Sequence, residues 1–255
     1  MTAGEMRLGS DIPIFVINLD RAPERFETVC GSARDYGLSL TRVSAIDGQL
    51  LPPQHTLAVD LKAFRRQHGR VVLPGEIGCY HSHLKALGAF LDSPAKFGLI
   101  LEDDVKFRED SISRISAIVS RCGQFGVVKL VNHRSNGFIT QTQTQAGDQI
   151  GRTMFGPQGS AAAYLVSREG ALELLEKMAL MSLPFDVALE RGWTRLSPFY
   201  SVKTRVFSFS KHRSSSAISG KKEYAKSKPR WYYRIPTAFF RTLEQFQRLI
   251  YALRQ

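Results

Sequence analysis

Short runs of consecutive apolar residues alternate along this chain with stretches in which apolar residues recur every three or four positions. The first run, residues 14–17, is continuous and rich in β-branched side chains, which predicts a strand buried on both faces of a sheet. Pro23 then opens a helical pattern that ends at Gly37, and a second strand is expected over residues 39–46. This order of strand, helix and strand predicts the start of a parallel α/β sheet.

The same alternation continues to about residue 210 and predicts one α/β domain over residues 12–210. Residues 49–75 contain Pro52-Pro53 and Pro74-Gly75, and we expect them to form an irregular surface excursion. Helices are expected over residues 76–91, around residues 112–119, and from Ser167 as N-cap to about residue 178. Strands are expected over residues 97–101, 127–131, 161–166 and 204–209.

The C-terminal region carries an amphipathic helical pattern. Its apolar residues recur at helical spacing, and polar or charged residues lie elsewhere around the helix. The pattern fits a terminal helix packed on the body and equally a helix on a membrane surface. The preceding lysines and the aromatic run 231–233 favour the membrane. The apolar positions are Phe239, Leu243, Phe246, Ile250 and Leu253.

Composition and charge add two limits to this picture. A chain of 255 residues with 43% hydrophobic content can bury a sizeable core, which excludes disorder as a whole. Of the formal net charge of +12, residues 211–255 carry +9, with eleven Lys or Arg against two Glu. We therefore expect a nearly neutral body followed by a basic extension over residues 211–255, suited to an anionic surface.

Cysteine usage and the N-terminal residues bear on the compartment. The three cysteines show no CxxC spacing, so neither a disulfide framework nor a structural zinc site is expected. The first eleven residues are mixed polar, and the apolar run after them is too short for a signal-peptide core. No apolar run approaches the roughly 20 residues that span a bilayer. These features predict a cytoplasmic protein.

Three carboxylates follow the expected strand at 97–101. Glu102, Asp103 and Asp104 are desolvated there unless a positive group meets them. Ligands of open α/β sheets bind beyond the carboxyl ends of the strands, and Mg²⁺ or Mn²⁺ takes carboxylate oxygens together with substrate phosphates. The alternative is a local role, in which the acids cap a helix or pair with Lys106 and Arg108.

A second polar group follows the first strand. Asn18, Asp20 and Arg21 lie at its end, and Arg25 comes one helical turn after Arg21. Two guanidinium groups on one helix face suit phosphate oxygens or a base edge. The alternative is a solvated capping network between Asp20 and the two arginines.

Residues 75–83 place two glycines and two histidines around a helix start. His81 and His83 are two positions apart, so on a helix they face different directions and cannot hold a metal together. We therefore expect no zinc site here. One of the two histidines is expected to orient a carboxylate or to line a donor pocket.

Six sequence blocks in order carry a specific resemblance. They are INLDRAPERF, SAIDG, LPGEIGCYHSHLKAL, LILEDDV, GSAAAYLVSREGALELL and PFDVAL, which together run from about residue 14 to residue 189. This series resembles glycosyltransferase family 25, whose members include bacterial lipooligosaccharide β-galactosyltransferases and collagen hydroxylysine galactosyltransferases. Each block is weak by itself, whereas six in the family's order are specific.

The resemblance implies a GT-A-like fold (a nucleotide-diphospho-sugar transferase) built as a single α/β domain with a mostly parallel central sheet. It also implies a UDP-sugar donor, usually UDP-galactose, with Mn²⁺ or Mg²⁺ and inversion at the anomeric carbon. Tyr164 falls in the family's small-residue segment, and His81 departs from the family pattern. The implied metal ligands are Asp104 first, then Asp103 and Glu102, with His212 as a late ligand. The implied donor-binding residues are Asn18, Asp20, Arg21, Arg25, Glu76, His83, Glu102, Asp103, Gly159 and Ser160.

An inverting transfer also needs a base that takes the proton of the acceptor hydroxyl. Asp186 and Glu190 are four residues apart, so a helix places them on one face, and either is a candidate. We prefer Asp186 for its position in the motif that contains Pro184. The alternative is that Asp186 caps the helix that follows this proline.

These inferences predict an enzyme that moves a hexose, galactose from UDP-galactose in a β-linkage, to a lipopolysaccharide or lipooligosaccharide core. It is expected to bind an anionic membrane surface as a peripheral protein on the inner face of the cytoplasmic membrane, and not nucleic acid. Two alternatives stay open. One is an enzyme of the same fold with another UDP-sugar, and the other is a non-enzymatic, basic nucleic-acid-binding protein.

Overall fold

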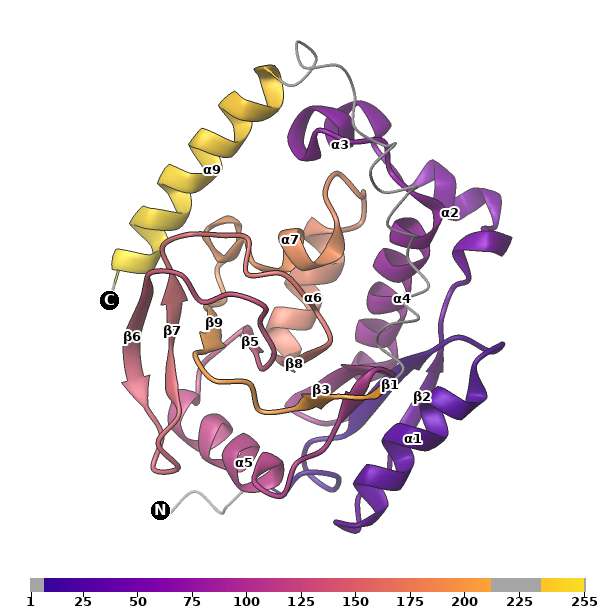
Figure 1. Cartoon of the computed structure of the whole chain (residues 1–255), viewed down its shortest axis with the longest axis vertical. Helices are drawn as coiled ribbons and strands as arrows, with labels where there is room; N and C mark the ends of the chain where they lie inside the picture. Colours follow the sequence, from indigo (N-terminus) through magenta and orange to yellow (C-terminus); the bar gives the residue numbers. More distant parts are fainter. Residues whose placement is uncertain (1–6, 212–234, 255) are drawn as a thin grey trace.

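An eight-stranded sheet runs through the protein (Figure 1). The computed structural model describes residues 7–211 and 235–254. The strand order is β2-β1-β3-β8-β5-β9-β7-β6, and β4 pairs separately with β10. The strands are β1 (Ile14–Asn18), β2 (Thr41–Ser44), β3 (Phe97–Glu102), β4 (Val105–Lys106), β5 (Val127–Lys129), β6 (Phe138–Gln143), β7 (Gln149–Thr153), β8 (Ala163–Ser167), β9 (Phe199–Val202) and β10 (Ser208–Phe209).

The sheet is mixed. β1 runs parallel to β2 and β3, and β5 runs parallel to β9. β8 lies antiparallel between β3 and β5, and β7 is antiparallel to both β6 and β9. β8 follows a hairpin with no crossover helix before it, which is the connection that allows an antiparallel neighbour. The α/β class is thus confirmed, and the expected parallel arrangement holds for the β2-β1-β3 half of the sheet.

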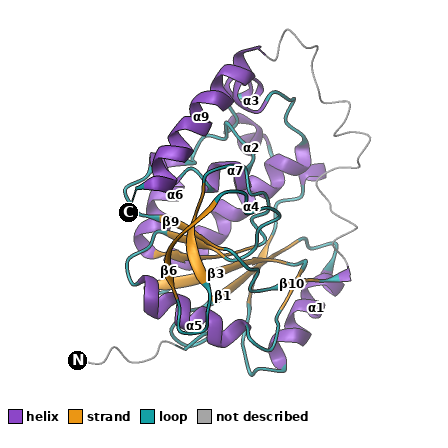
Figure 2. Ribbon diagram, turned by 60° about the vertical axis from the view of Figure 1, so that its left-hand side comes forward, coloured by secondary structure: helices purple, strands orange, loops and turns teal. Residues whose placement is uncertain are grey.

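Helices cover both faces of the sheet (Figure 2). Ile14 and Val16 point into the core shared with α1 and α5, whereas Phe15 and Ile17 point into the core shared with α4 and α6. This alternation makes β1 apolar throughout, as its sequence predicted. The helices are α1 (Pro23–Arg34), α2 (Pro53–Leu57), α3 (Leu61–His68), α4 (Pro74–Leu91), α5 (Ser111–Cys122), α6 (Arg168–Lys177), α7 (Phe185–Leu189) and α9 (Ile235–Leu253), with short 3-10 turns η1 (Gly48–Leu50) and η2 (Gly192–Thr194).

Two expectations about these elements were wrong. Residues 49–75 are not irregular: they contain η1, α2 and α3, and α3 begins with a side-chain cap from Asp60 and ends at Gly69 with a φ of 77°. The last strand of the sheet is β9, and only Ser208–Phe209 of the expected strand at 204–209 is extended. The hairpin β6–β7 was also missed, because its mostly polar residues lack a continuous apolar run.

The amphipathic C-terminal pattern forms α9, which lies along the outer edge of the molecule (Figure 1). It packs against α3, β7 and η2. Arg152 of β7 donates to the carbonyl oxygens of Tyr251 at 2.8 Å and Arg254 at 2.9 Å. Arg241 donates to the carbonyl oxygen of His68 at 2.8 Å, which joins α9 to the end of α3. Among the described helices, none has both the length and the hydropathy of a membrane-crossing segment.

Acid should weaken the stability of this fold through His68, at the junction of α3 and α9. Burial and the charges of Arg241 and Arg70 lower the pKa of His68 from 6.5 to about 4. The folded state thus favours the neutral ring, so the stabilisation is complete above pH 6.5 and is lost as the pH falls towards 4. The loss is about 3 kcal/mol at most. Urea unfolding between about pH 7 and pH 4.5 should show a smaller pH dependence in His68→Gln than in the wild type. Identical pH dependence in both proteins would contradict this role.

Candidate functional site

The carboxyl ends of β1, β2 and β3 meet at one edge of the sheet, because these strands run parallel. A pocket of about 110 Å³ opens there. The ends of β1 and β3, the loop after β2 and the first turns of α4 surround it. The lining residues are Ile17, Leu19, Arg25, residues 45–48, Gly75, Cys79, Ser82, His83 and residues 102–104. We call this cavity the strand-end pocket.

Asp103 ties the end of β3 to the end of β1. One of its oxygens is 2.5 Å from Nη2 of Arg25, and the other accepts from the amide of Asn18 at 2.8 Å. Asn18 also donates to the carbonyl oxygen of Ala22 at 2.9 Å, so the turn into α1 belongs to the same network. Burial raises the pKa of Asp103, and the Asn18 hydrogen bond and the Arg25 charge oppose that rise. Both carboxylate oxygens of Asp103 are therefore committed to protein groups.

Asp20 and Arg21 do not form the capping network considered from the sequence. Asp20 accepts from Arg42 at 2.7 Å and from Ser44 at 2.8 Å, which lowers its pKa. Arg21 precedes the first residue of α1 and pairs with Asp47 at 2.6 Å. Arg21 and Arg25 thus diverge to different acids, and the prediction that they share a helix face was wrong. Arg25 and Asp47 line the strand-end pocket.

Glycines in the segment 75–83 let α4 approach the loop after β2. A Cβ atom on Gly78 would lie 2.5 Å from the carbonyl oxygen of Ile46. Ser82 accepts from the backbone amide of Ile46 at 2.8 Å and so ties that loop to α4. Glu76 accepts from the amide of Leu73 at 2.9 Å and caps its own helix, and burial raises its pKa. The contacts described for Glu76 are thus with its helix start, while Ser82 shapes the pocket.

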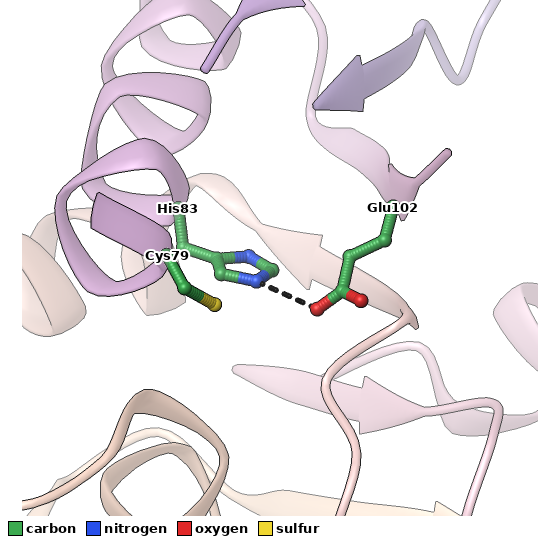
Figure 3. Close-up of side chains that lie close together, drawn as sticks. All are labelled: Cys79, His83 and Glu102. Atoms are coloured by element: carbon green, nitrogen blue, oxygen red, sulfur yellow. Dashed lines mark hydrogen bonds and ion pairs between the residues drawn. The ribbon is translucent and has the colours of Figure 1, made fainter. Parts of the chain in front are cut away.

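His83 faces the first acid of the triplet from α4 (Figure 3). Its Nε2 lies 3.2 Å from an oxygen of Glu102, and its Nδ1 lies 3.3 Å from the hydroxyl of Tyr164. The ring stacks on Phe185 with centroids 4.0 Å apart, so its orientation is held from two sides. This geometry places His83 beside a carboxylate, as expected for one of the two histidines. His81 instead contacts His55, with ring centroids 4.6 Å apart.

Cys79 joins His83 and Glu102 in a group with one donor atom each, all within 4.8 Å of one another (Figure 3). Cys79 and His83 are one helical turn apart on α4, a spacing that lets both side chains face one ion. Sulfur, nitrogen and oxygen donors together suit Zn²⁺. The pair of Cys79 and His83 was not predicted from the sequence, where only His81 with His83 was considered as a metal site. The i, i+4 spacing of a cysteine and a histidine was the signal that could have found it.

The strand-end pocket is electronegative. Burial and the nearby charges of Glu102, Asp186, Glu76 and Asp104 raise the pKa of the Cys79 thiol well above its ordinary value. Arg25 is the only Lys or Arg among the described lining residues, and its charge is neutralised by the ion pair with Asp103. Carboxylates of Glu102 and Asp104 line the pocket, and oxygen donors of this kind fit Mg²⁺ or Mn²⁺. Asp103 fits such an ion poorly, because both of its oxygens are engaged.

A cluster of buried ion pairs surrounds Glu190, whose charge acts on Asp186. Glu190 has one oxygen 2.5 Å from Nζ of Lys129 and the other 3.2 Å from Arg248 of α9. It also accepts from the amides of Gln158 at 2.9 Å and Gly159 at 3.1 Å. Burial alone would raise the pKa of Glu190, but Lys129, Arg248 and these hydrogen bonds hold it below its ordinary value.

This environment does not suit Glu190 as a base. It corrects the expectation that Glu190, like Asp186, is a candidate for that role. The side chains of Glu190 and Lys129 are fully buried, and four donors occupy the two oxygens of Glu190. The cluster holds the loop that contains Gly159, with a φ of 73°, and Ser160, with a φ of 70°. Neither Lys129 nor Arg248 was predicted as a site residue from the sequence. A lysine within a short apolar strand and an arginine on an amphipathic helix give no distinctive motif.

Asp186 lies in the first turn of α7 and is half-buried. Burial and the charge of Glu190 raise its pKa, whereas Lys129 and the amides of Val187 and Ser160 oppose the rise. One oxygen accepts from the amide of Val187 at 2.9 Å, so Asp186 also has the capping contact considered as its alternative. Its raised pKa suits a group that takes up a proton.

A larger groove of about 690 Å³ lies between α9 and the body. Leu183 and Val187 line it on the α7 side, and Phe240 and Leu249 line it on the α9 side. Phe185 of α7 meanwhile stacks on His83 of the strand-end pocket. α7 and Asp186 thus lie between the pocket and the groove. His212, the expected late metal ligand, lies outside the described residues.

Comparisons with known proteins agree with the sequence blocks. The model of "Glycosyltransferase family 25 (LPS biosynthesis protein)" matches residues 11–189. A "Glycosyltransferase 25 family member" of Drosophila melanogaster is 25% identical over 198 residues, 72% of this chain and 32% of that protein. "Procollagen galactosyltransferase 1" of Danio rerio is 29% identical over 105 residues, 40% of this chain and 17% of that protein.

Some relatives are named as inactive members of the family. "Inactive glycosyltransferase 25 family member 3" of Homo sapiens is 31% identical over 117 residues, 44% of this chain and 20% of that protein. The chain therefore aligns with a third or less of each of these longer relatives. What the whole relatives act on does not transfer to this chain by similarity alone.

Replacement of Arg25 should destabilise the protein far more than replacement of Arg21. Arg25→Met leaves the buried Asp103 carboxylate without its cation, and we expect a loss of about 3 kcal/mol in the free energy of unfolding. Arg21→Met is the matched control: its side chain is 49% exposed, and we expect a loss below about 1 kcal/mol. Urea titration measures both, and equal losses would show that Asp103 does not anchor the pocket.

Proposed function

This chain belongs to glycosyltransferase family 25, and from that premise we propose that it transfers a hexose from a UDP-sugar to a lipopolysaccharide or lipooligosaccharide core. We propose galactose from UDP-galactose, joined in a β-linkage with inversion, on a GT-A-like fold. The names of two relatives, procollagen galactosyltransferases 1 and 2, support galactose, and the family's description supports the acceptor. Another UDP-sugar is the alternative donor. Family membership gives no support to the nucleic-acid-binding alternative.

The observation that carries this proposal is the negative charge of the strand-end pocket. A UDP-sugar brings a diphosphate, which carboxylates at the pocket wall repel. Arg25 cannot offset that charge, because it is paired with Asp103. We therefore propose that Glu102 and Asp104 hold Mn²⁺ or Mg²⁺. Such a cation neutralises the diphosphate and stabilises UDP as it departs.

Other residues around the pocket hold its walls and its acids in position. Asn18 and Asp103 tie the end of β1 to the residue that follows β3, so the donor meets a preformed edge. His83, whose side chain is buried, holds Glu102 by a hydrogen bond and is itself held by stacking on Phe185. Ser82 and Gly78 fix the loop after β2, whose backbone we propose lies beside the nucleoside.

The acceptor in this proposal approaches from the groove under α9. α7 separates the groove from the strand-end pocket, and Asp186 stands at the start of this helix. Asp186 would take the proton from the acceptor hydroxyl while the oxygen attacks the anomeric carbon from the face opposite UDP. We place this reaction on the inner face of the cytoplasmic membrane, with the protein as a peripheral component.

Donor hydrolysis without acceptor tests the pocket directly. We expect the protein to consume one member of a panel of UDP-galactose, UDP-glucose and UDP-N-acetylhexosamines, to lose this activity in EDTA, and to regain it with Mn²⁺ or Mg²⁺. Asp104→Asn should lower the rate by about a hundredfold, since the charge near the diphosphate is then unanswered. Glu176→Gln, at an acid whose side chain is 71% exposed, is the control and should leave the rate unchanged.

Two results would contradict the metal site. One is the absence of consumption with every donor, and the other is consumption that neither EDTA nor Asp104→Asn alters. Zn²⁺ and a Cys79→Ser variant separate the two possible ligand sets. Loss of metal response in Cys79→Ser with a preference for Zn²⁺ would assign the ion to Cys79, His83 and Glu102 instead.

Asp186→Asn should abolish transfer and spare donor binding. We expect kcat to fall by a factor of about 10² to 10⁴ while the affinity for UDP stays within about twofold. In the wild type, kcat/KM should fall as the pH drops through the pKa of Asp186, which burial raises above 3.8, because the protonated acid cannot act as a base. A variant that keeps wild-type kcat, or that loses UDP affinity in the same proportion, would exclude Asp186 as the base.

A further inference from the structure

The apolar face of α9 points away from the protein. Its members follow one another at helical spacing over the whole helix, and every one of them is largely exposed. We call this set the α9 stripe. Their exposed fractions are 62% for Ile235, 69% for Phe239, 47% for Leu243, 60% for Phe246, 53% for Ile250 and 60% for Leu253.

The opposite face of α9 packs on the body through both apolar and polar side chains: Ala252 is buried, Tyr251 packs on Trp193, and several polar groups make specific contacts. Arg248 is buried and reaches Glu190 at 3.2 Å. Glu244 accepts from Arg191 at 2.8 Å and 2.9 Å, and Gln245 donates to the carbonyl oxygen of Met154 at 2.5 Å. An amphipathic helix on a globular body ordinarily packs the other way, with its apolar stripe inwards.

These polar contacts also fix the rotation of α9 about its own axis. Turning the α9 stripe inwards would remove Arg248 from Glu190 and leave a buried carboxylate with one cation fewer. It would also break the pair between Arg191 and Glu244. The stripe is therefore held outwards by the cluster that also holds the loop with Gly159.

Charge around the α9 stripe is positive. Glu244 is the only acid of α9, and it forms an ion pair with Arg191. Arg241, in the second turn of the helix, and Arg254, directly after its last residue, are exposed, and α3 beside it presents exposed Lys62, Arg65 and Arg66.

We propose that the α9 stripe is a membrane-docking surface that inserts into the interface of an anionic lipid bilayer. A helix of 19 residues is about 28 Å long, so it can lie along the interface over its full length. The stripe enters the boundary between headgroups and acyl chains, and the surrounding cations bind lipid phosphates. A second copy of this chain is a poorer occupant, because the same cations would face one another.

This inference deepens the proposed function, on which it rests for the identity of the acceptor. The inner face of α9 lines the groove through which that acceptor is proposed to enter, while its outer face contacts the bilayer. A lipid-linked acceptor would then reach Asp186 without leaving the membrane. The binding of vesicles by the protein is measurable without any knowledge of the acceptor.

Vesicle flotation of the full chain tests the surface. We expect binding to phosphatidylethanolamine vesicles that contain phosphatidylglycerol, weaker binding at high salt, and little binding to phosphatidylcholine alone. Phe239→Ser with Ile250→Ser, at two stripe residues that do not line the groove, should lower binding by about tenfold or more. The matched control is Leu172→Ser with Leu180→Ser, whose parent residues are 56% and 53% exposed on another part of the surface, and it should bind as the wild type does.

Equal loss in both double variants, or no binding to anionic vesicles by the wild type, would overturn the proposal. So would a dimer in light scattering that Phe239→Ser with Ile250→Ser dissociates, since the stripe would then bind a second copy. Donor hydrolysis without vesicles, measured on the same preparations, should be the same in the stripe variant and the wild type. Hydrolysis without vesicle binding rejects the docking surface alone, and vesicle binding without hydrolysis rejects the proposed function alone.

Discussion

The pairing of Asp103 with Arg25 and Asn18 is the constraint on which the candidate site depends. β1 and β3 are neighbours in the sheet, but backbone pairing fixes only their register and not the course of the loops that follow them. Asp103 supplies that missing constraint with one carboxylate, which holds an arginine of α1 and the last side chain of β1. All three acids of the triplet line the strand-end pocket, and because Asp103 is used in this way, Glu102 and Asp104 are the two that we propose as cation ligands.

A second buried acid, Glu190, joins separate elements in the other half of the molecule. Glu190 joins β5 through Lys129, α9 through Arg248, and the loop of Gly159 through two backbone amides. Removing either cation would leave the buried Glu190 carboxylate with one cation fewer, so these elements are expected to stabilise one another. The position of α9, the shape of the groove beneath it and the backbone that meets Asp186 are thereby linked.

The sequence predicted the parts of this structure that local patterns determine. The apolar run of β1, the proline at the start of α1 and the cap at Ser167 each specify an element from a few adjacent residues, and each lies where it was expected. β9 and the β6–β7 hairpin were missed, because a short or polar strand is recognisable only from its neighbours in the sheet. The family resemblance named Arg25, His83 and residues 102–104, which the structure brings together at the strand-end pocket, but it could not separate the roles of adjacent acids.

Residues with the same chemistry in the sequence have different partners in space. Asp103 and Asp104 are consecutive carboxylates that both line the pocket, yet Asp103 has both of its oxygens held by Arg25 and Asn18. Asp186 and Glu190 share a helical spacing, yet the cluster around Glu190 withdraws it from base chemistry. For α9, the periodicity identified the helix correctly and left its orientation open. The structure shows that the face with Arg248, Tyr251 and Ala252 is packed on the body and that the α9 stripe is exposed.

The central claim is that a UDP-sugar binds in the strand-end pocket with its diphosphate against Glu102 and Asp104. A crystal structure of the protein with UDP and Mn²⁺, using the anomalous signal of manganese, tests it most directly. The account predicts one manganese peak beside these two carboxylates, diphosphate oxygens on the ion, and the uridine against the loop of residues 45–48. Manganese and UDP bound elsewhere, or UDP in this pocket with no ion between its phosphates and the acids, would contradict it.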